Sequence, residues 1–71
     1  MPKETFLKLP KEKQEKILEA GKKEFARVAF EETSIKNIIE NAKIARGSFY
    51  QYFESKEDLL RIYFKQSYKF N

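Results

Sequence analysis

Between Thr33 and Lys56 the chain carries an arginine, side-chain amides and several hydroxyl groups that could bind a ligand. The guanidinium of Arg46 can donate two parallel hydrogen bonds to a planar acceptor such as the O6 and N7 edge of guanine. The hydroxyls of Tyr50 and Tyr52 and the ammonium of Lys56 suit phosphate oxygens. These groups can bind a polyanion through hydrogen bonds and charge, whereas bond-breaking chemistry needs other side chains.

The composition excludes several classes of catalytic and metal site. The chain contains neither cysteine nor histidine, so it has no thiol nucleophile, imidazole base, disulfide or zinc finger. No pair of nucleophile and base and no cluster of metal ligands can be assembled from the remaining side chains. We therefore expect no enzyme activity, no metal and no cofactor.

The charge balance favours a polyanionic partner. Fifteen basic residues against eleven acidic ones give a net charge of +4. Within residues 33–53, Lys36, Lys43 and Arg46 are opposed by Glu40 alone. No apolar run approaches the roughly 18 residues of a membrane span, and the N-terminus lacks the apolar core of a signal peptide. We expect a cytoplasmic chain without a membrane partner.

The segments that must position these side chains have the pattern of helices. Glycine and proline occur twice each, and strong helix formers dominate throughout. The apolar spacing predicts an all-α chain, with helices over about residues 10–30, 34–41 and 45–52 and a fourth from about residue 56. The two short helices joined by a tight turn predict a helix-turn-helix within a single domain spanning residues 1–71.

The helix over about residues 45–52 has two different faces. With Arg46 placed at 0°, a turn of 100° per residue puts Tyr50 at about 40° and Gln51 at about 140°. Phe49 and Phe53 fall near 300° and 340° on the same wheel. We predict that the phenylalanines anchor this helix in the core and that its polar face is free.

Two glycines lie inside predicted helices, where each costs about 1 kcal/mol relative to alanine. Gly21 is tolerable if another helix crosses closely at that point. Gly47 has a functional explanation, close approach of the backbone to a ligand, and a simpler one, chance or local bending.

Helix ends are marked by hydroxyl residues. Thr33 or Ser34 supplies the oxygen that caps the helix over 34–41, and a hydroxyl at that place can also contact a phosphate. Ser55 followed by Asp58 predicts a capping box at the start of the last helix. Before residue 10, the apolar side chains of Phe6, Leu7 and Leu9 predict a short turn that folds back on the domain.

The last helix carries more apolar residues than one face of a small domain can bury. Some of this surface should pack on something outside the chain. An alternative function is therefore a helical protein-interaction module that binds a partner through the following residues: Leu59, Leu60, Ile62, Tyr63 and Phe64.

The run TSIKNIIENAKIARGSFYQYFESKEDLL resembles the helix-turn-helix signature of the TetR (tetracycline repressor-like) family of bacterial transcriptional regulators. The resemblance covers about residues 11–63, and SFYQYFESKEDLL is its most specific part. It implies a three-helix DNA-binding head with the helix over 45–52 in the major groove of double-stranded operator DNA. It also implies a C-terminal domain, absent from this chain, that forms a homodimer and binds an inducer of unknown identity, which releases a repressor from its operator.

The resemblance also implies roles for single residues. Base contacts are expected from Arg46 and Gln51, and close backbone approach is expected at Gly47. Contacts to DNA phosphates are expected from Thr33, Ser34, Ser48, Tyr50, Tyr52 and Lys56.

Three positions depart from the family pattern. Lys43 stands where a turn glycine is usual, which costs on the order of 1 kcal/mol if the residue is left-handed. Ala45 stands where a serine or threonine often caps the third helix, so that cap is weaker. Ala29 replaces a common glycine and leaves the end of the first helix open. None of the three removes a side chain expected to contact DNA.

Overall fold

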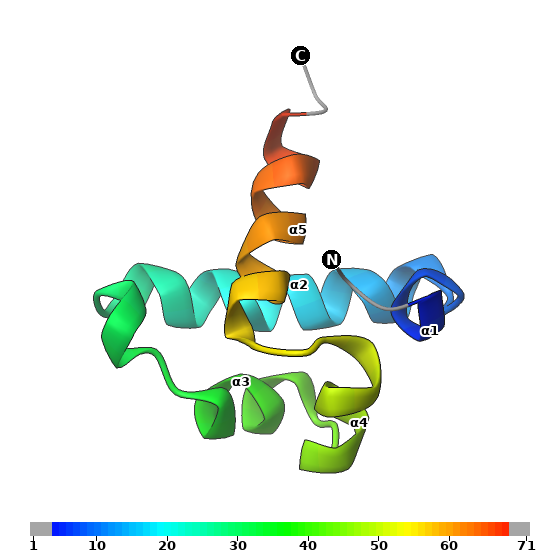
Figure 1. Ribbon diagram of the computed structural model, residues 1–71, viewed down its shortest axis with the longest axis horizontal. Helices are drawn as coiled ribbons and strands as arrows, with labels where there is room; N and C mark the ends of the chain where they lie inside the picture. The colour runs from blue at the N-terminus through cyan, green and yellow to red at the C-terminus, as the bar shows by residue number, and fades with distance from the viewer. Residues whose placement is uncertain (1–3, 69–71) are drawn as a thin grey trace.

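Helical elements follow one another along residues 4–68, the part of the chain that the computed structural model describes. They are α1 (Glu4–Leu7), α2 (Lys11–Arg27), the 3-10 turn η1 (Phe30–Glu32), α3 (Ile35–Ala42), α4 (Arg46–Tyr52) and α5 (Lys56–Tyr68). In Figure 1, α2 runs horizontally, α5 rises across it, and α3 and α4 lie below α2. The predicted all-α fold with a helix-turn-helix, formed by α3 and α4, is confirmed.

Each of the five α-helices contributes a side chain with no exposed surface to the core. These are Phe6, Ile17, Ile38, Phe49 and Leu59. Phe53, just after α4, joins them, and its ring centroid lies 4.9 Å from that of Phe6 and 5.2 Å from that of Phe49. The segment before Pro10 therefore folds back on the domain as predicted, and it covers α4.

The close helix crossing expected at Gly21 is present. A Cβ atom at this position would lie 2.9 Å from Cδ2 of Leu59, which comes from α5. A contact this short cannot be accommodated without a shift of the buried leucine. Glycine at position 21 thus lets α5 pack directly on the backbone of α2.

The first long helix ends earlier than predicted, at Arg27 instead of Phe30. Val28 has φ −143° and ψ 170°, and Ala29 has φ −60° and ψ 152°, so both residues are extended. Neither has a positive φ, and alanine therefore suits the position where the family often has glycine. Phe30 begins η1, a separate turn that leads toward α3.

The turn between α3 and α4 requires a left-handed residue, which is Lys43 with φ 61° and ψ 44°. Its amide donates to the carbonyl of Glu40 at 3.3 Å, and the amide of Ile44 donates to the carbonyl of Ile39 at 3.1 Å. This pair of bonds is a Schellman motif. Ala45 is the N-cap of α4 and makes no side-chain capping bond, as expected.

The start of α5 differs from the predicted capping box. Asp58 accepts a hydrogen bond from the amide of Glu54 at 2.8 Å, one residue before Ser55. The acid also pairs with Arg61 at 3.2 Å. Asp58 therefore binds the loop before α5 at a position one residue earlier than in a capping box.

The apolar surface of α5 is partly used within the domain. Leu59 and Ile62 are buried in the core, Leu60 and Tyr63 are half-buried, and Phe64 is 52% exposed. Within residues 4–68 no helix combines the length and apolarity needed to span a membrane.

Candidate nucleic-acid interface

The outer face of α4 presents polar groups on an aromatic support. Arg46, Gly47, Tyr50 and Gln51 are all exposed, and Phe49 on the opposite face is fully buried. The predicted orientation of this helix is therefore confirmed. The guanidinium of Arg46, the phenol of Tyr50, the amide of Gln51 and the backbone of Gly47 form one polar strip.

Arg46 is available to an external acceptor. In the part of the chain that the structure describes, ion pairs join Arg27 to Glu24 and Arg61 to Asp58, and none involves Arg46. A salt bridge to the nearby Glu40 or Glu54 would occupy the guanidinium, and none is formed among these residues.

Gly47 has no packing reason to be glycine. A Cβ atom at this position would meet nothing within 4 Å, and the residue does not have a positive φ. Alanine would fit the folded protein and favour the helix. Close approach of an external surface to the backbone of α4 stays a prediction.

The two serines lie at the N-termini of the paired helices. Ser34 is the N-cap of α3, and its hydroxyl oxygen accepts from the amide of Asn37 at 3.2 Å. A hydroxyl that accepts in this way keeps its hydrogen as a donor. Ser48 lies in the first turn of α4 and is half-buried. Of the two capping residues left open by the sequence, the structure selects Ser34.

Thr33 and Tyr52, two of the residues expected to bind phosphate, lie in the interior of the domain. Thr33 is 6% exposed, and its hydroxyl donates to the carbonyl of Phe30 at 2.6 Å. Tyr52 is 7% exposed, and its ring meets that of Phe6 edge-on at 6.2 Å. On the helical wheel Tyr52 falls near 240°, far from Arg46 and Gln51, so the period already indicated burial.

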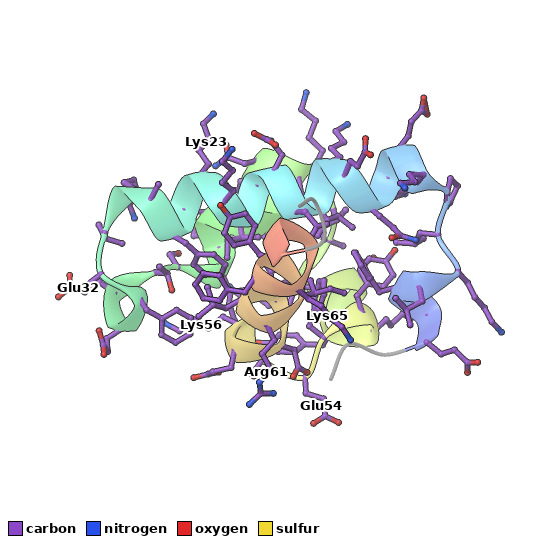
Figure 2. The ribbon with its side chains drawn as sticks, turned by 90° about the horizontal axis from the view of Figure 1, so that it is seen from above. Lys23, Glu32, Glu54, Lys56, Arg61 and Lys65 are labelled. Carbon is purple, nitrogen blue, oxygen red and sulfur yellow. The ribbon has the colours of Figure 1, made fainter. Side chains whose placement is uncertain are left out.

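Lys56 also has internal partners. Its ammonium donates to the backbone carbonyls of Thr33 at 3.0 Å, Phe30 at 3.1 Å and Glu31 at 3.4 Å. The same nitrogen lies 5.0 Å from the centroid of the Phe30 ring. In Figure 2 the side chain extends from α5 toward η1, whereas Glu32 points away from the protein.

Glu24 is a residue that the sequence analysis missed. Its carboxylate is 2% exposed and accepts from the amide of Ser34 at 2.8 Å. Arg27 binds it through both Nη2 at 2.7 Å and Nε at 3.0 Å, and the side-chain amide of Asn37 adds weaker contacts. The hydrogen bonds from Arg27 outweigh burial and, with the bond from Ser34, lower the pKa of Glu24 to about 2.

A signal for Glu24 was present in the sequence. It continues the spacing of Ile17, Ala20 and Gly21 along the buried face of α2, and Arg27 follows three residues later. A carboxylate on an apolar face with an arginine one turn away indicates a buried ion pair. The network it forms holds the start of α3, and through α3 it supports the exposed face of α4.

Residues 17–62 match the family described as "Bacterial regulatory proteins, tetR family". The chain belongs to the TetR family. The matched segment contains the helix-turn-helix and most of the core, and members of this family are transcriptional regulators, not enzymes. The family predicted from the run over residues 33–60 is therefore confirmed.

Relatives of this TetR-family chain include two regulators of Bacillus subtilis (strain 168). The uncharacterized HTH-type transcriptional regulator YuxN is 46% identical over 50 residues, which are 70% of this chain and 17% of the relative. The uncharacterized HTH-type transcriptional regulator YfiR is 43% identical over 49 residues, 69% of this chain and 24% of the relative.

A solved structure of a TetR family transcriptional regulator from Chloroflexus aurantiacus J-10-fl has the same fold. It is 47% identical, with a TM-score of 0.77 over 83% of this chain and 27% of that one. The chain thus spans between about a sixth and about a quarter of the length of these three relatives.

Proposed function

We propose that this TetR-family chain binds double-stranded DNA in a sequence-specific manner, with α4 in the major groove. The observation that carries the proposal is the polar strip of α4, whose exposed residues stand on the fully buried Phe49. A helix of this kind, held by a second helix across a tight turn, fits the major groove. Arg46 and Gln51 are the residues proposed to read base edges, with the backbone of Gly47 close to the DNA.

The charges around α4 also favour DNA binding by this surface. Lys36, Lys43 and Arg46 are exposed on α3, the turn and α4, and Glu40 is the one acid in this stretch. Phosphate oxygens attract such cations and accept hydrogen bonds from hydroxyl groups. Ser34, Ser48 and Tyr50 are the hydroxyl residues whose position is compatible with phosphate contacts.

The regulation of the whole protein is inferred from its family. We propose a cytoplasmic homodimer that places two heads on a roughly palindromic operator, since symmetric dimers match symmetric half-sites. We further propose that it is a repressor and that an inducer bound to a C-terminal domain releases it. The relatives are themselves described as transcriptional regulators, which supports a regulatory role.

Selection from random DNA duplexes tests the proposal. The protein should enrich a common half-site, and its affinity should fall steeply as salt rises because counterions are released from phosphates. If the chain is instead a module that binds a partner helix through α5, no duplex will be retained at low salt. Binding of that partner would respond little to salt.

Replacing Arg46 with alanine should weaken binding to the selected duplex by about 1 to 3 kcal/mol and relax the preference at one base pair. The cause is the loss of a bidentate contact to guanine. Competition titrations with duplexes altered at single positions measure the effect. An equal loss on selected and random DNA would mean that Arg46 only neutralises phosphate.

Replacing Gly47 with alanine should raise the stability of the domain and lower its affinity for DNA. The free energy of unfolding should rise by about 0.5 to 1 kcal/mol because alanine favours the helix and its Cβ is unhindered. Affinity for the duplex should fall by roughly tenfold, about 1.4 kcal/mol, if the backbone approaches DNA.

Gly21→Ala is the matched control for this change. It should lower the free energy of unfolding by about 1 to 3 kcal/mol, because its Cβ would collide with Leu59. Urea unfolding and fluorescence anisotropy give the two quantities for both variants. Unchanged DNA affinity in Gly47→Ala would remove the close backbone approach from the proposal.

A further inference from the structure

The short helix α1 packs against the end of α4, the helix proposed to enter the major groove. Phe6 of α1 has no exposed surface, and the centroid of its ring lies 6.2 Å from that of Tyr52 and 4.9 Å from that of Phe53. Tyr52 is the last residue of α4, and Phe53 follows it. The two helices lie toward the same end of α2 (Figure 1). Phe6 therefore supports the C-terminal end of α4 from its buried side.

The four residues of α1 are too few for a helix that is stable alone, because isolated helices shorter than about 12 residues are marginal in water. α1 therefore depends on contacts with the rest of the domain. Gln14 of α2 supplies two of them, since its side-chain Nε2 donates to the carbonyls of Leu7 at 3.1 Å and Leu9 at 2.9 Å. Both hydrogens of this amide thus bind the end of the segment that carries Phe6.

We propose that Gln14 is a positioning residue for the DNA-binding face. It fastens α1 to α2, and α1 in turn holds α4, through Phe6, in the orientation that base reading requires. The inference rests on the proposed function, because the orientation of α4 matters for base reading only if this helix lies in the major groove. It gives α1 a part in sequence recognition through its packing.

The two ends of α4 are supported differently. The first end follows α3 across the tight turn at Lys43, so the chain itself holds it. The other end continues into Phe53 and rests on the ring of Phe6. Gln51, which is proposed to read a base edge, lies close to this second end. A shift there would displace the Gln51 amide, whereas binding to phosphates rests largely on charge and is independent of sequence.

Amide hydrogen exchange of the free protein tests the fastening of α1 without DNA. Methionine has the length of glutamine but no N–H donor, so Gln14→Met removes both hydrogen bonds. The amide of Leu9, which donates to the carbonyl of Phe6 at 3.1 Å, should exchange roughly tenfold faster relative to the α3 amides. The amide of Phe53, which donates to the carbonyl of Phe49 at 2.8 Å, should also exchange faster.

Two further variants complete this measurement. Lys13→Met is the control, because Lys13 is the neighbouring residue of α2 and its side chain is exposed. It should leave exchange at Leu9 and Phe53 unchanged. Gln14→Glu keeps the shape of the side chain but replaces the donating nitrogen with an oxygen, so it should speed exchange as Gln14→Met does. Unchanged exchange at Leu9 or Phe53 in the two Gln14 variants would overturn the role of Gln14.

Duplex binding tests whether the fastening serves sequence recognition. Gln14→Met has the charge of the wild type, so its affinity for random duplexes should change by less than about twofold. Its affinity for the selected duplex should fall roughly tenfold, the loss expected when one bidentate base contact is misplaced. Competition titration gives the ratio of the two affinities. A purely structural role would not change this ratio, because partial unfolding lowers both affinities by the same factor, and an equal loss on both duplexes would overturn the proposal.

The two measurements separate this inference from the proposed function. If the wild type binds no duplex at low salt, the proposed function fails, while exchange still decides whether Gln14 fastens α1 to the domain. If the wild type selects a half-site and Gln14→Met keeps the same ratio of affinities, the proposed function stands and the positioning role of Gln14 is wrong.

Discussion

Replacing Phe49 with alanine should lower the free energy of unfolding by roughly 3 to 5 kcal/mol, the range for a buried phenylalanine. Phe49 has no exposed surface. The centroid of its ring lies 5.2 Å from that of Phe53 and 5.3 Å from that of Tyr50. A domain of this size has only a few kcal/mol of net stability. The variant is therefore expected to be largely unfolded at 25 °C, as measured by circular dichroism during urea titration.

Gln51→Ala is the control for this prediction. Gln51 lies on the same helix but is exposed, so its removal should change the free energy of unfolding by no more than about 0.5 kcal/mol. A cooperative unfolding transition of Phe49→Ala close to that of the wild type would show that α4 packs through a different face.

Acid should destabilise the fold through Glu24. The pKa of this carboxyl is lowered from an ordinary 4.5 to about 2, chiefly by its hydrogen bonds from Arg27 and despite its burial. Because the folded protein holds the charged form more strongly, the stabilisation is present in full above pH 4.5. It is lost as the pH falls from there toward 2, and its size is up to about 3 kcal/mol.

The measurement is urea unfolding of the wild type and Glu24→Gln between pH 7 and pH 2. The wild type should be the more stable protein at neutral pH, and the difference should shrink as the pH falls through this window. Glu19→Gln is the control because Glu19 is exposed on the same helix. A difference between wild type and Glu24→Gln that stays constant down to pH 2 would contradict the charged network.

The parts of the site that were predicted correctly depend on local structure. The helical period placed Phe49 inside and Arg46 and Gln51 outside, because side-chain direction along a helix repeats with a known angle. The same period places Tyr52 inside, and the structure agrees with the period. Its hydroxyl group and the family resemblance had both assigned it to phosphate. The contacts of Arg46 and Gln51 with bases remain predictions.

The helix ends were predicted less well, since they depend on competing caps. The first long helix stops at Arg27 because Val28 and Ala29 are extended. The carboxylate of Asp58, at the start of α5, accepts from the amide of Glu54 instead of the amide of Ser55. Such bonds are decided by where the preceding loop packs, and the residue pattern does not specify that path.

The sequence by itself determined the all-helical class, the helix-turn-helix and the two faces of α4, because these follow from residue type and a period of 3.6. It also indicated the family, through the resemblance of residues 33–60 to a known signature. Only the tertiary structure decided what Lys56 and Glu24 bind. The carbonyls that Lys56 binds and the amide of Ser34 that Glu24 binds belong to the backbone, so no residue pattern marks them, whereas the spacing on α2 did indicate the pairing of Glu24 with Arg27. They come within reach only when α2 and α5 pack against the segment between Phe30 and Ser34.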